Sequence, residues 1–193
     1  MTSKKLNILI VEDEYLIASG IAICIEELGH NLVGVAGTGT EAMEIVGRTD
    51  PDIILMDINL PGMDGIEVMA KINESRRIPC IFITGYSDSG LIARAQSPFT
   101  YAYLIKPVDI SDLRAAINVA MSRFEDYSKV SNSLDKATKA LEERKTIERA
   151  KGIVMDLLGL KETQAMQYLQ KKSRNSNARV IDIARKIIEI NGK

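Results

Sequence analysis

Five polar side chains follow or end apolar runs of the sequence. Glu12 and Asp13 come after the first run, Asp57 after the third, Thr84 at the end of the fourth and Lys106 after the fifth. Three carboxylates held together repel each other unless a cation lies among them, and a set of oxygen ligands favours Mg²⁺. A carboxylate beside such an ion, faced by an ammonium and a hydroxyl, can attack phosphorus and form an aspartyl phosphate. The alternative is that each residue only caps a helix or starts a turn.

Short apolar runs that alternate with helix-period segments must position these side chains. The runs cover residues 6–11, 32–35, 53–56, 80–84 and 101–105. Their length and their Ile and Val content are typical of strands buried on both faces. Between them, residues 15–28, 40–46 and 66–72 each place apolar side chains on one helical face. Alternating strands and helices predict an α/β fold with a doubly wound parallel sheet, whose carboxyl edge gathers the polar side chains.

A long helix is predicted after Pro107. Between Asp109 and Leu158 there is no proline, and Asp109 or Ser111 can cap the start. Apolar positions recur at alternating steps of four and three residues, which is a heptad seam interrupted by two polar residues. The seam consists of Leu113, Ile117, Ala120, Phe124, Tyr127, Ser131, Leu134, Thr138 and Leu141. Either the helix packs on its own domain or, as we favour, it leaves that domain and pairs with a second protomer.

Three amphipathic segments at the end of the chain predict a small three-helix bundle. The first is the last part of the long helix, which Gly159 ends, the second covers residues 161–172 and the third begins near Val180. Residues 173–177 are predicted as a polar turn. Short amphipathic helices can bury their apolar stripes only against each other. The formal charge also changes, from −7 before Lys139 to +6 from Lys139 onward, which favours a polyanionic partner for the second part.

The composition argues against several classes of protein. Cys24 and Cys80 lie far apart in apolar stretches and are expected to be buried, reduced thiols. His30 is the only histidine, so a zinc cluster of histidine and cysteine is not expected. The sequence shows no secretion signal and no apolar stretch of the roughly 20 residues that a membrane helix needs. We therefore expect a cytoplasmic protein without a membrane partner.

The polar residues of the first part, taken together, resemble the receiver domain of bacterial two-component response regulators. The matching motifs are VEDE at 11–14, LMDINLPGMDG at 55–65, TG at 84–85 and YLIKP at 103–107. The resemblance covers about residues 5–122 and implies a flavodoxin-like fold with a five-stranded parallel sheet. It also implies that Asp57 is the phosphoacceptor, Lys106 the phosphate contact, and Thr84 and Tyr103 the switch pair.

The same resemblance implies a Mg²⁺ site. Its ligands would be Asp13, Asp57 and the backbone carbonyl of Asn59, with Glu12 assisting directly or through water. A cis peptide bond before Pro107 is implied as well. In two places the sequence departs from the family. Glu12 stands where aspartate is more common, and residues 96–100 replace an alanine- and glycine-rich turn beside a surface that many receivers use for dimerisation.

The end of the chain resembles the ANTAR domain, an RNA-binding antitermination module. The resemblance covers about residues 139–190, and the long helix at 109–147 overlaps both domains. It rests on residues 141–155, on Ala165, Leu169, Ser173 and Asn177, and on residues 179–184. It implies binding of paired RNA hairpins with short loops.

Candidate RNA contacts are cations that can reach phosphates or stack on loop bases. They are Arg144, Lys151, Arg174, Arg179, Lys171 and Lys172. The alternative is that these side chains form a solvated basic face. Gly152 lies inside the predicted helix at a cost of about 1 kcal/mol relative to alanine, which suggests close approach of another helix or of RNA.

The sequence therefore predicts a phosphorylation-controlled regulator. A sensor histidine kinase phosphorylates Asp57, the Thr84–Tyr103 switch shifts the population of the receiver, and dimerisation through the long helix brings two bundles to tandem RNA hairpins. No enzyme activity is expected beyond slow self-dephosphorylation. One alternative is a phosphorylation-gated protein-interaction regulator without nucleic-acid binding. A duplex-DNA regulator is disfavoured because no recognition-helix pair is evident, and a metal-dependent phosphatase because no substrate pocket is evident near the site.

Overall fold

The structure is a computed structural model that describes residues 5–85 and 99–191. It divides into two compact units, Met1–Tyr127 and Ser128–Lys193. Residues 96–98, part of the departure from the family pattern, lie outside the described residues. Within the described part, the model contains no helix with the length and hydropathy of a membrane span.

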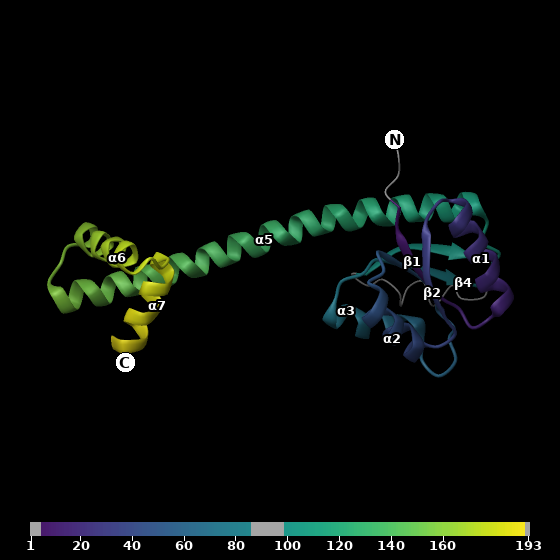
Figure 1. Cartoon of the computed structure of the whole chain (residues 1–193), viewed down its shortest axis with the longest axis horizontal. Coiled ribbons are helices and arrows are strands. Elements are labelled where there is room, and N and C mark those ends of the chain that lie inside the picture. The colour runs from purple at the N-terminus through teal and green to yellow at the C-terminus, as the bar shows by residue number, and fades with distance from the viewer. Residues whose placement is uncertain (1–4, 86–98, 192–193) are drawn as a thin grey trace. The chain divides into compact units, whose positions relative to one another are not determined.

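The first unit contains a parallel sheet with helices on both faces (Figure 1). The five strands lie in the order β2-β1-β3-β4-β5. They are β1 (Asn7–Val11), β2 (Asn31–Ala36), β3 (Ile53–Asp57), β4 (Cys80–Thr84) and β5 (Thr100–Ile105). The helices are α1 (Tyr15–Glu27), α2 (Gly39–Thr49), α3 (Gly65–Ser75) and the first part of α5 (Ile110–Leu158). The prediction of a doubly wound five-stranded parallel sheet is confirmed.

Successive residues of the central strands point into two different cores. In β1, Ile8 and Ile10 pack with α1 and α5, whereas Leu9 and Val11 pack with α2 and α3. Because side chains alternate along a strand and helices cover both faces, every residue of β3 and β4 is buried. This explains why these strands are continuous apolar runs in the sequence. Cys80 is fully buried in one of these cores.

Local signals in the sequence fix several helix ends. The Asp109 carboxylate accepts a hydrogen bond of 2.9 Å from the backbone N–H of Asp112, which confirms the predicted cap of α5. The Asp64 carboxylate accepts one of 2.7 Å from the N–H of Ile66 at the start of α3. Gly29 follows α1 with a φ of +79°, a left-handed conformation that glycine adopts without strain.

The second unit is a three-helix bundle made of the end of α5, α6 (Glu162–Ser176) and α7 (Val180–Asn191). Its core consists of Ala150, Val154, Ala165, Leu169, Ile183 and Ala184. The predicted turn at 173–177 is wrong for its first four residues, because α6 continues to Ser176. Asn177, with a φ of +49°, ends the helix, and the Ser173 hydroxyl donates a hydrogen bond of 2.5 Å to the carbonyl of Ala178.

The predicted seam of α5 has two different parts. Leu113, Ile117 and Ala120 are buried in a core of the first unit, and Phe124 packs against that core. Further along, every residue from 132 to 142 is exposed. The first part of the helix therefore packs on its own domain, and pairing with a second protomer stays a prediction for the exposed part only.

Candidate functional site

The carboxyl edge of the sheet brings the predicted carboxylates together. Glu12 and Asp13 directly follow β1, and Asp57 is the last residue of β3. One oxygen of each of these three side chains lies within 4.8 Å of the other two. Glu12 and Asp57 are buried, whereas Asp13 is exposed. The site therefore consists of two buried acids and a third acid that is exposed to solvent at the edge of the site.

Lys106 completes this cluster from the end of β5. Its ammonium donates hydrogen bonds of 2.6 Å to Asp57 and 2.9 Å to Glu12, and it lies 3.9 Å from the carboxylate of Glu14. Burial alone would lower the pKa of Lys106, but the hydrogen bonds to Asp57 and Glu12 outweigh it, and the net effect is a raised pKa. Burial also raises the pKa of Glu12, against the hydrogen bond from Lys106. The contact with Glu14 was not predicted.

Backbone packing fixes the position of Asp57. The N–H of Asn59 donates a hydrogen bond of 3.0 Å to one carboxylate oxygen of Asp57, and Lys106 binds the other oxygen. Behind it, the N–H of Gly65 donates one of 2.9 Å to the carbonyl of Ile58. A Cβ on Gly65 would collide with the carbonyl oxygen of Asp57, so only glycine fits where α3 begins.

The donor set of this cluster fits a Mg²⁺ ion. Three carboxylates supply oxygen atoms, which magnesium prefers. Lys106 lies 2.9 Å from both side-chain oxygens of Glu12, but only Oε1 accepts its hydrogen bond. Among the described residues, the buried Oε2 of Glu12 has no hydrogen-bond partner, so it can still take a metal ion or a metal-bound water. The acidic triad is typical of the Mg²⁺ site of receiver domains.

The predicted switch residues flank the cluster on β4 and β5. Thr84 is buried at the end of β4, and its hydroxyl lies 3.3 Å from the carbonyl of Gly85. The Tyr103 ring stacks on Phe82, with ring centres 6.1 Å apart. Burial raises the pKa of Tyr103, against a hydrogen bond with Thr100. The peptide bond between Lys106 and Pro107 is cis, as the family resemblance implied.

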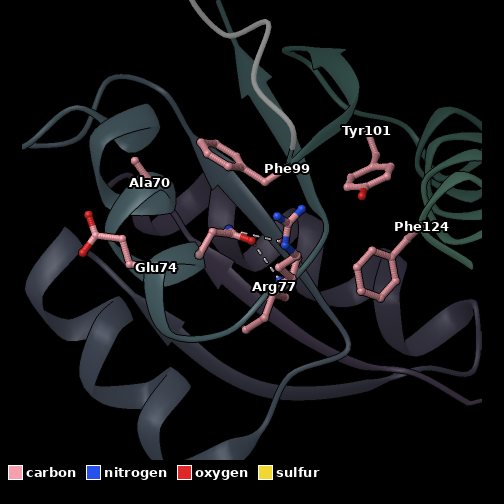
Figure 2. A pocket seen from close by; sticks show the side chains of 8 residues that line it. Ala70, Glu74, Arg77, Phe99, Tyr101 and Phe124 are labelled. Carbon is pink, nitrogen blue, oxygen red and sulfur yellow. Dashed lines mark hydrogen bonds between the residues drawn. The ribbon is translucent and has the colours of Figure 1, made fainter. Parts of the chain in front are cut away.

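A separate pocket of the first unit lies near the amino-terminal ends of β4 and β5, away from the carboxylates (Figure 2). It encloses about 230 Å³. Figure 2 shows Arg77 among the rings of Phe99, Tyr101 and Phe124. The Arg77 guanidinium donates a hydrogen bond to the Tyr127 hydroxyl on α5. These contacts attach the edge of the sheet to α5 and were not predicted.

In the second unit, Lys151 does not have the environment of a surface RNA contact. Its side chain is buried, and its ammonium lies 2.8 Å from Glu148 and 2.7 Å from Glu162. Hydrogen bonds with Glu148 and Glu162 raise the pKa of Lys151, and Lys151 in turn lowers the pKa of Glu162. The residue therefore joins α5 to the start of α6.

The other predicted RNA contacts are exposed. Arg179 pairs with Asp182 at 3.3 Å and lies 3.9 Å from Glu143. Lys172 lies over the ring of Tyr168, 5.7 Å from its centre. Arg144, Lys171 and Arg174 are exposed on α5 and α6. Gly152 has open space where a Cβ would lie, so within the described residues no neighbouring helix accounts for this glycine.

A groove between α5 and α7 is lined by three cations that are not among the predicted RNA contacts. Lys145 and Arg149 come from α5 and Arg185 from α7. Thr146, Ile188 and Glu189 complete the lining. The helical period places Lys145 and Arg149 on one face of α5, but only the packing of α7 against α5 reveals Arg185 as their neighbour.

Both parts of the chain match known protein families. Residues 8–118 match the response regulator receiver domain, and residues 135–188 match the ANTAR domain. The transcriptional regulatory protein PdtaR of Mycobacterium tuberculosis is 35% identical over 186 residues, which cover 96% of this chain and 91% of that protein. The phyllosphere-induced regulator PhyR of Methylorubrum extorquens is 39% identical over 118 residues, which cover 60% of this chain and 43% of that protein.

Solved structures resemble the first unit. The signal receiver domain of a modulated diguanylate cyclase from Desulfovibrio desulfuricans superposes with a TM-score of 0.58 at 36% identity, and the match covers 62% of this chain and 96% of that one. The receiver domain of PhyR from Erythrobacter litoralis gives a TM-score of 0.54 at 35% identity, covering 61% of this chain and 90% of that one.

Proposed function

Because this chain belongs to the response regulators that join a receiver domain to an ANTAR domain, we propose that phosphorylation of Asp57 controls its binding to RNA. The phosphoryl donor would be a sensor histidine kinase, and the RNA would be tandem hairpins in mRNA leaders, bound by a dimer. The observation that carries this proposal is the buried Asp57 carboxylate, which shares the ammonium of Lys106 with Glu12. We propose residues 5–122 and 139–190 as the two domains.

At the receiver site, an Asp57 oxygen forms a bond to phosphorus while the bond from phosphorus to the donor nitrogen breaks. The electrons of that bond stay with the nitrogen of the phosphohistidine. Lys106, which is held at 2.6 Å from Asp57, offsets negative charge on the transferred oxygens. The hydroxyl of Thr84 would bind the phosphoryl group once it is attached. The receiver thus accepts the group without turning over a separate substrate.

Glu12, Asp13, Asp57 and the backbone carbonyl of Asn59 would hold Mg²⁺ at this site. The ion, when bound, supplies positive charge beside the transferred phosphoryl oxygens. The carboxylate oxygens of the triad, within 4.8 Å of one another, support this assignment. Asp13 is the acid at the rim, so its oxygens are accessible to an ion with its water shell.

Phosphorylation of the receiver domain would act on the ANTAR domain by shifting the populations of receiver conformations. A phosphoryl group on Asp57 that contacts Thr84 favours receiver conformations in which Thr84 and Tyr103 both change position. This change alters the surface formed by β5 and α5. The exposed seam of α5 would then pair with a second protomer. Leu134 and Leu141 of this seam are 65% and 54% exposed, which is unusual for large apolar side chains and supports such pairing.

The experiment that tests this proposal measures binding of the full chain to a leader RNA with tandem hairpins, with and without beryllofluoride as a phosphoryl mimic. Duplex DNA of equal length is the control. We expect RNA binding that strengthens with the mimic and requires Asp57. RNA binding that ignores the mimic would refute the switch, and absence of RNA binding on a panel of leaders would favour a protein partner instead.

A further inference from the structure

We infer that the groove between α5 and α7 binds the phosphate backbone of RNA, with Lys145, Arg149 and Arg185 as the phosphate contacts. The inference rests on the proposed RNA-binding function and assigns it a site. The groove encloses about 430 Å³ and presents three cations and one carboxylate, Glu189. Its net positive charge complements a polyanion.

The cations of this groove are available, in contrast to Lys151 and Arg179. Across residues 5–85 and 99–191, no carboxylate lies within 4.0 Å of the ammonium of Lys145 or the guanidinium of Arg149. Arg185 has one long contact, 3.9 Å, with Asp182. Lys151 and Arg179, by comparison, already bind carboxylates within 3.3 Å. A ligand phosphate would therefore displace few existing ion pairs in the groove.

The groove is held in shape by the core beneath it. Ala150 and Ala184, next to Arg149 and Arg185 in sequence, are fully buried between the helices. Ile188 is half-buried against the same core and forms an apolar part of the groove lining. Because α5 and α7 pack on the same core at this point, the backbone positions of Arg149 and Arg185 are fixed before RNA arrives, and only their side chains must be ordered on binding.

The residue types also favour phosphate over a protein carboxylate as ligand. Arg149 and Arg185 each offer a planar fork of donors that matches two phosphate oxygens, and Lys145 adds a point charge. Lys145 and Arg149 are four residues apart on α5, about 6 Å along the helix axis, so they can contact different phosphates of one strand. Three contacts along a groove fit an extended polyanion better than a single acidic side chain.

The test compares two triple variants of the full chain with beryllofluoride and an RNA of two short-looped hairpins in tandem. The groove variant carries Lys145→Ala, Arg149→Ala and Arg185→Ala. The control carries Lys129→Ala, Lys136→Ala and Lys139→Ala, which removes equal charge from exposed positions of α5 outside the groove. Circular dichroism checks that both variants keep their helices.

We expect the groove variant to bind RNA at least 10-fold more weakly at 0.1 M salt, and its slope of log affinity against log salt to fall by about two. The control should change either quantity far less. Equal losses in both variants, with tight binding by the unaltered chain, would overturn the groove and leave the proposed function standing. If the unaltered chain bound no RNA, both would be refuted. Binding by a Lys145→Arg, Arg149→Lys and Arg185→Lys variant that is stronger than that of the alanine variant, but weaker than that of the unaltered chain, would confirm that both charge and the arginine forks contribute.

Discussion

Lys106 in the receiver and Lys151 in the bundle each donate hydrogen bonds to two carboxylates, but the burial of those carboxylates differs between the two clusters. In the receiver, the Lys106 side chain is 17% exposed, and the carboxylates of Glu12 and Asp57 are 1% and 5% exposed. In the three-helix bundle, the Lys151 side chain is similarly buried, at 10% exposed, but the carboxylates of Glu148 and Glu162 are 52% and 70% exposed. Buried acids need a cation, whereas solvated acids do not.

This difference shows why two lysines that look alike in the sequence have different roles. The receiver holds its carboxylates in a buried site, where the positive charge of a metal ion can offset the negative charge of a phosphoryl group. The bundle uses the lysine to join two helices, and water satisfies its acids. Substitutions at matched positions of the two clusters test whether the burial of the acids decides these roles.

The largest expected effect is loss of phosphorylation. Asp57→Asn removes the nucleophilic oxygen, so incorporation of phosphoryl groups from a small-molecule donor should fall to background. Asp13→Asn removes a carboxylate from the same triad but keeps the acceptor, and should show slower incorporation that rises with the Mg²⁺ concentration. Gel mobility of the phosphorylated form measures both. Retained labelling in the Asp57 variant would place the phosphoryl group elsewhere.

Lys106→Met should have the next largest effect. It removes one source of positive charge at the transferred oxygens, which typically slows such reactions by about 10²-fold. It also leaves the carboxylates of Glu12 and Asp57 buried without a cation, at a cost of about 3 kcal/mol in metal-free buffer. Thermal unfolding with and without Mg²⁺ tests this, because the ion should restore part of the lost stability. Equal unfolding temperatures for the variant and the unaltered chain would contradict the buried charge cluster.

Lys151→Met should destabilise the protein less than Lys106→Met, since Glu148 and Glu162 remain solvated. RNA affinity should also fall much less than in the groove variant. Thermal unfolding and RNA titration measure the two effects side by side. A loss of affinity equal to that of the groove variant, in a folded protein, would show that Lys151 contacts RNA directly, as the sequence alone suggested.

The two glycines beside the clusters extend the comparison. Gly65→Ala should destabilise the receiver, because the new methyl group would collide with the carbonyl oxygen of Asp57. Gly152→Ala should stabilise the bundle by about 1 kcal/mol, because its Cβ meets open space and alanine favours the helix. Chemical denaturation checks both signs. A higher free energy of unfolding combined with weaker RNA binding in the Gly152 variant would indicate that RNA approaches this helix closely.

The smallest expected effect is on the pH dependence of the stability of the bundle. Lys151 lowers the pKa of Glu162, so their interaction stabilises the folded bundle above the usual glutamate pKa and is lost as the pH falls through the lowered value. Glu162→Gln should abolish this component, so the two proteins should differ in stability at pH 6 and converge as the pH falls below the lowered pKa of Glu162. Unfolding curves across this range give the comparison. Because Glu162 is exposed, solvent screens the interaction and the difference is small.

The sequence predicts the structure best where the order of residues along the chain is sufficient to determine it. Strands buried on both faces appear as apolar runs, and the carboxyl ends of parallel strands share an edge, so the meeting of Glu12 and Asp57 followed from their positions. The end of α6 was predicted too early because Ser173 and its polar neighbours favour turns. In the structure, the Ser173 hydroxyl instead donates a hydrogen bond to the carbonyl of Ala178, beyond the end of the helix.

Contacts between helices explain the remaining differences. Glu148 is three residues from Lys151 and can be recognised by helical spacing, but Glu162 lies beyond the turn at Gly159, and only the packing of α6 brings it near. Arg185 meets Arg149 for the same reason. The first half of the α5 seam packs on its own domain rather than on a second protomer, the alternative that we favoured, and its period is the same in both cases.

The stretch of α5 from residue 132 to 142, where every side chain is exposed, has a consequence for how this helix forms. A helix segment of this length is marginal in water by itself, because starting a helix is costly while extending one is not. The cores at both ends supply two starting points, from which the helical hydrogen bonds can propagate inward. Unfolding of either core would leave the exposed turns to fray from that side, so amide hydrogens between 132 and 142 should exchange faster than those at Leu113 or Val154, which are buried in those cores.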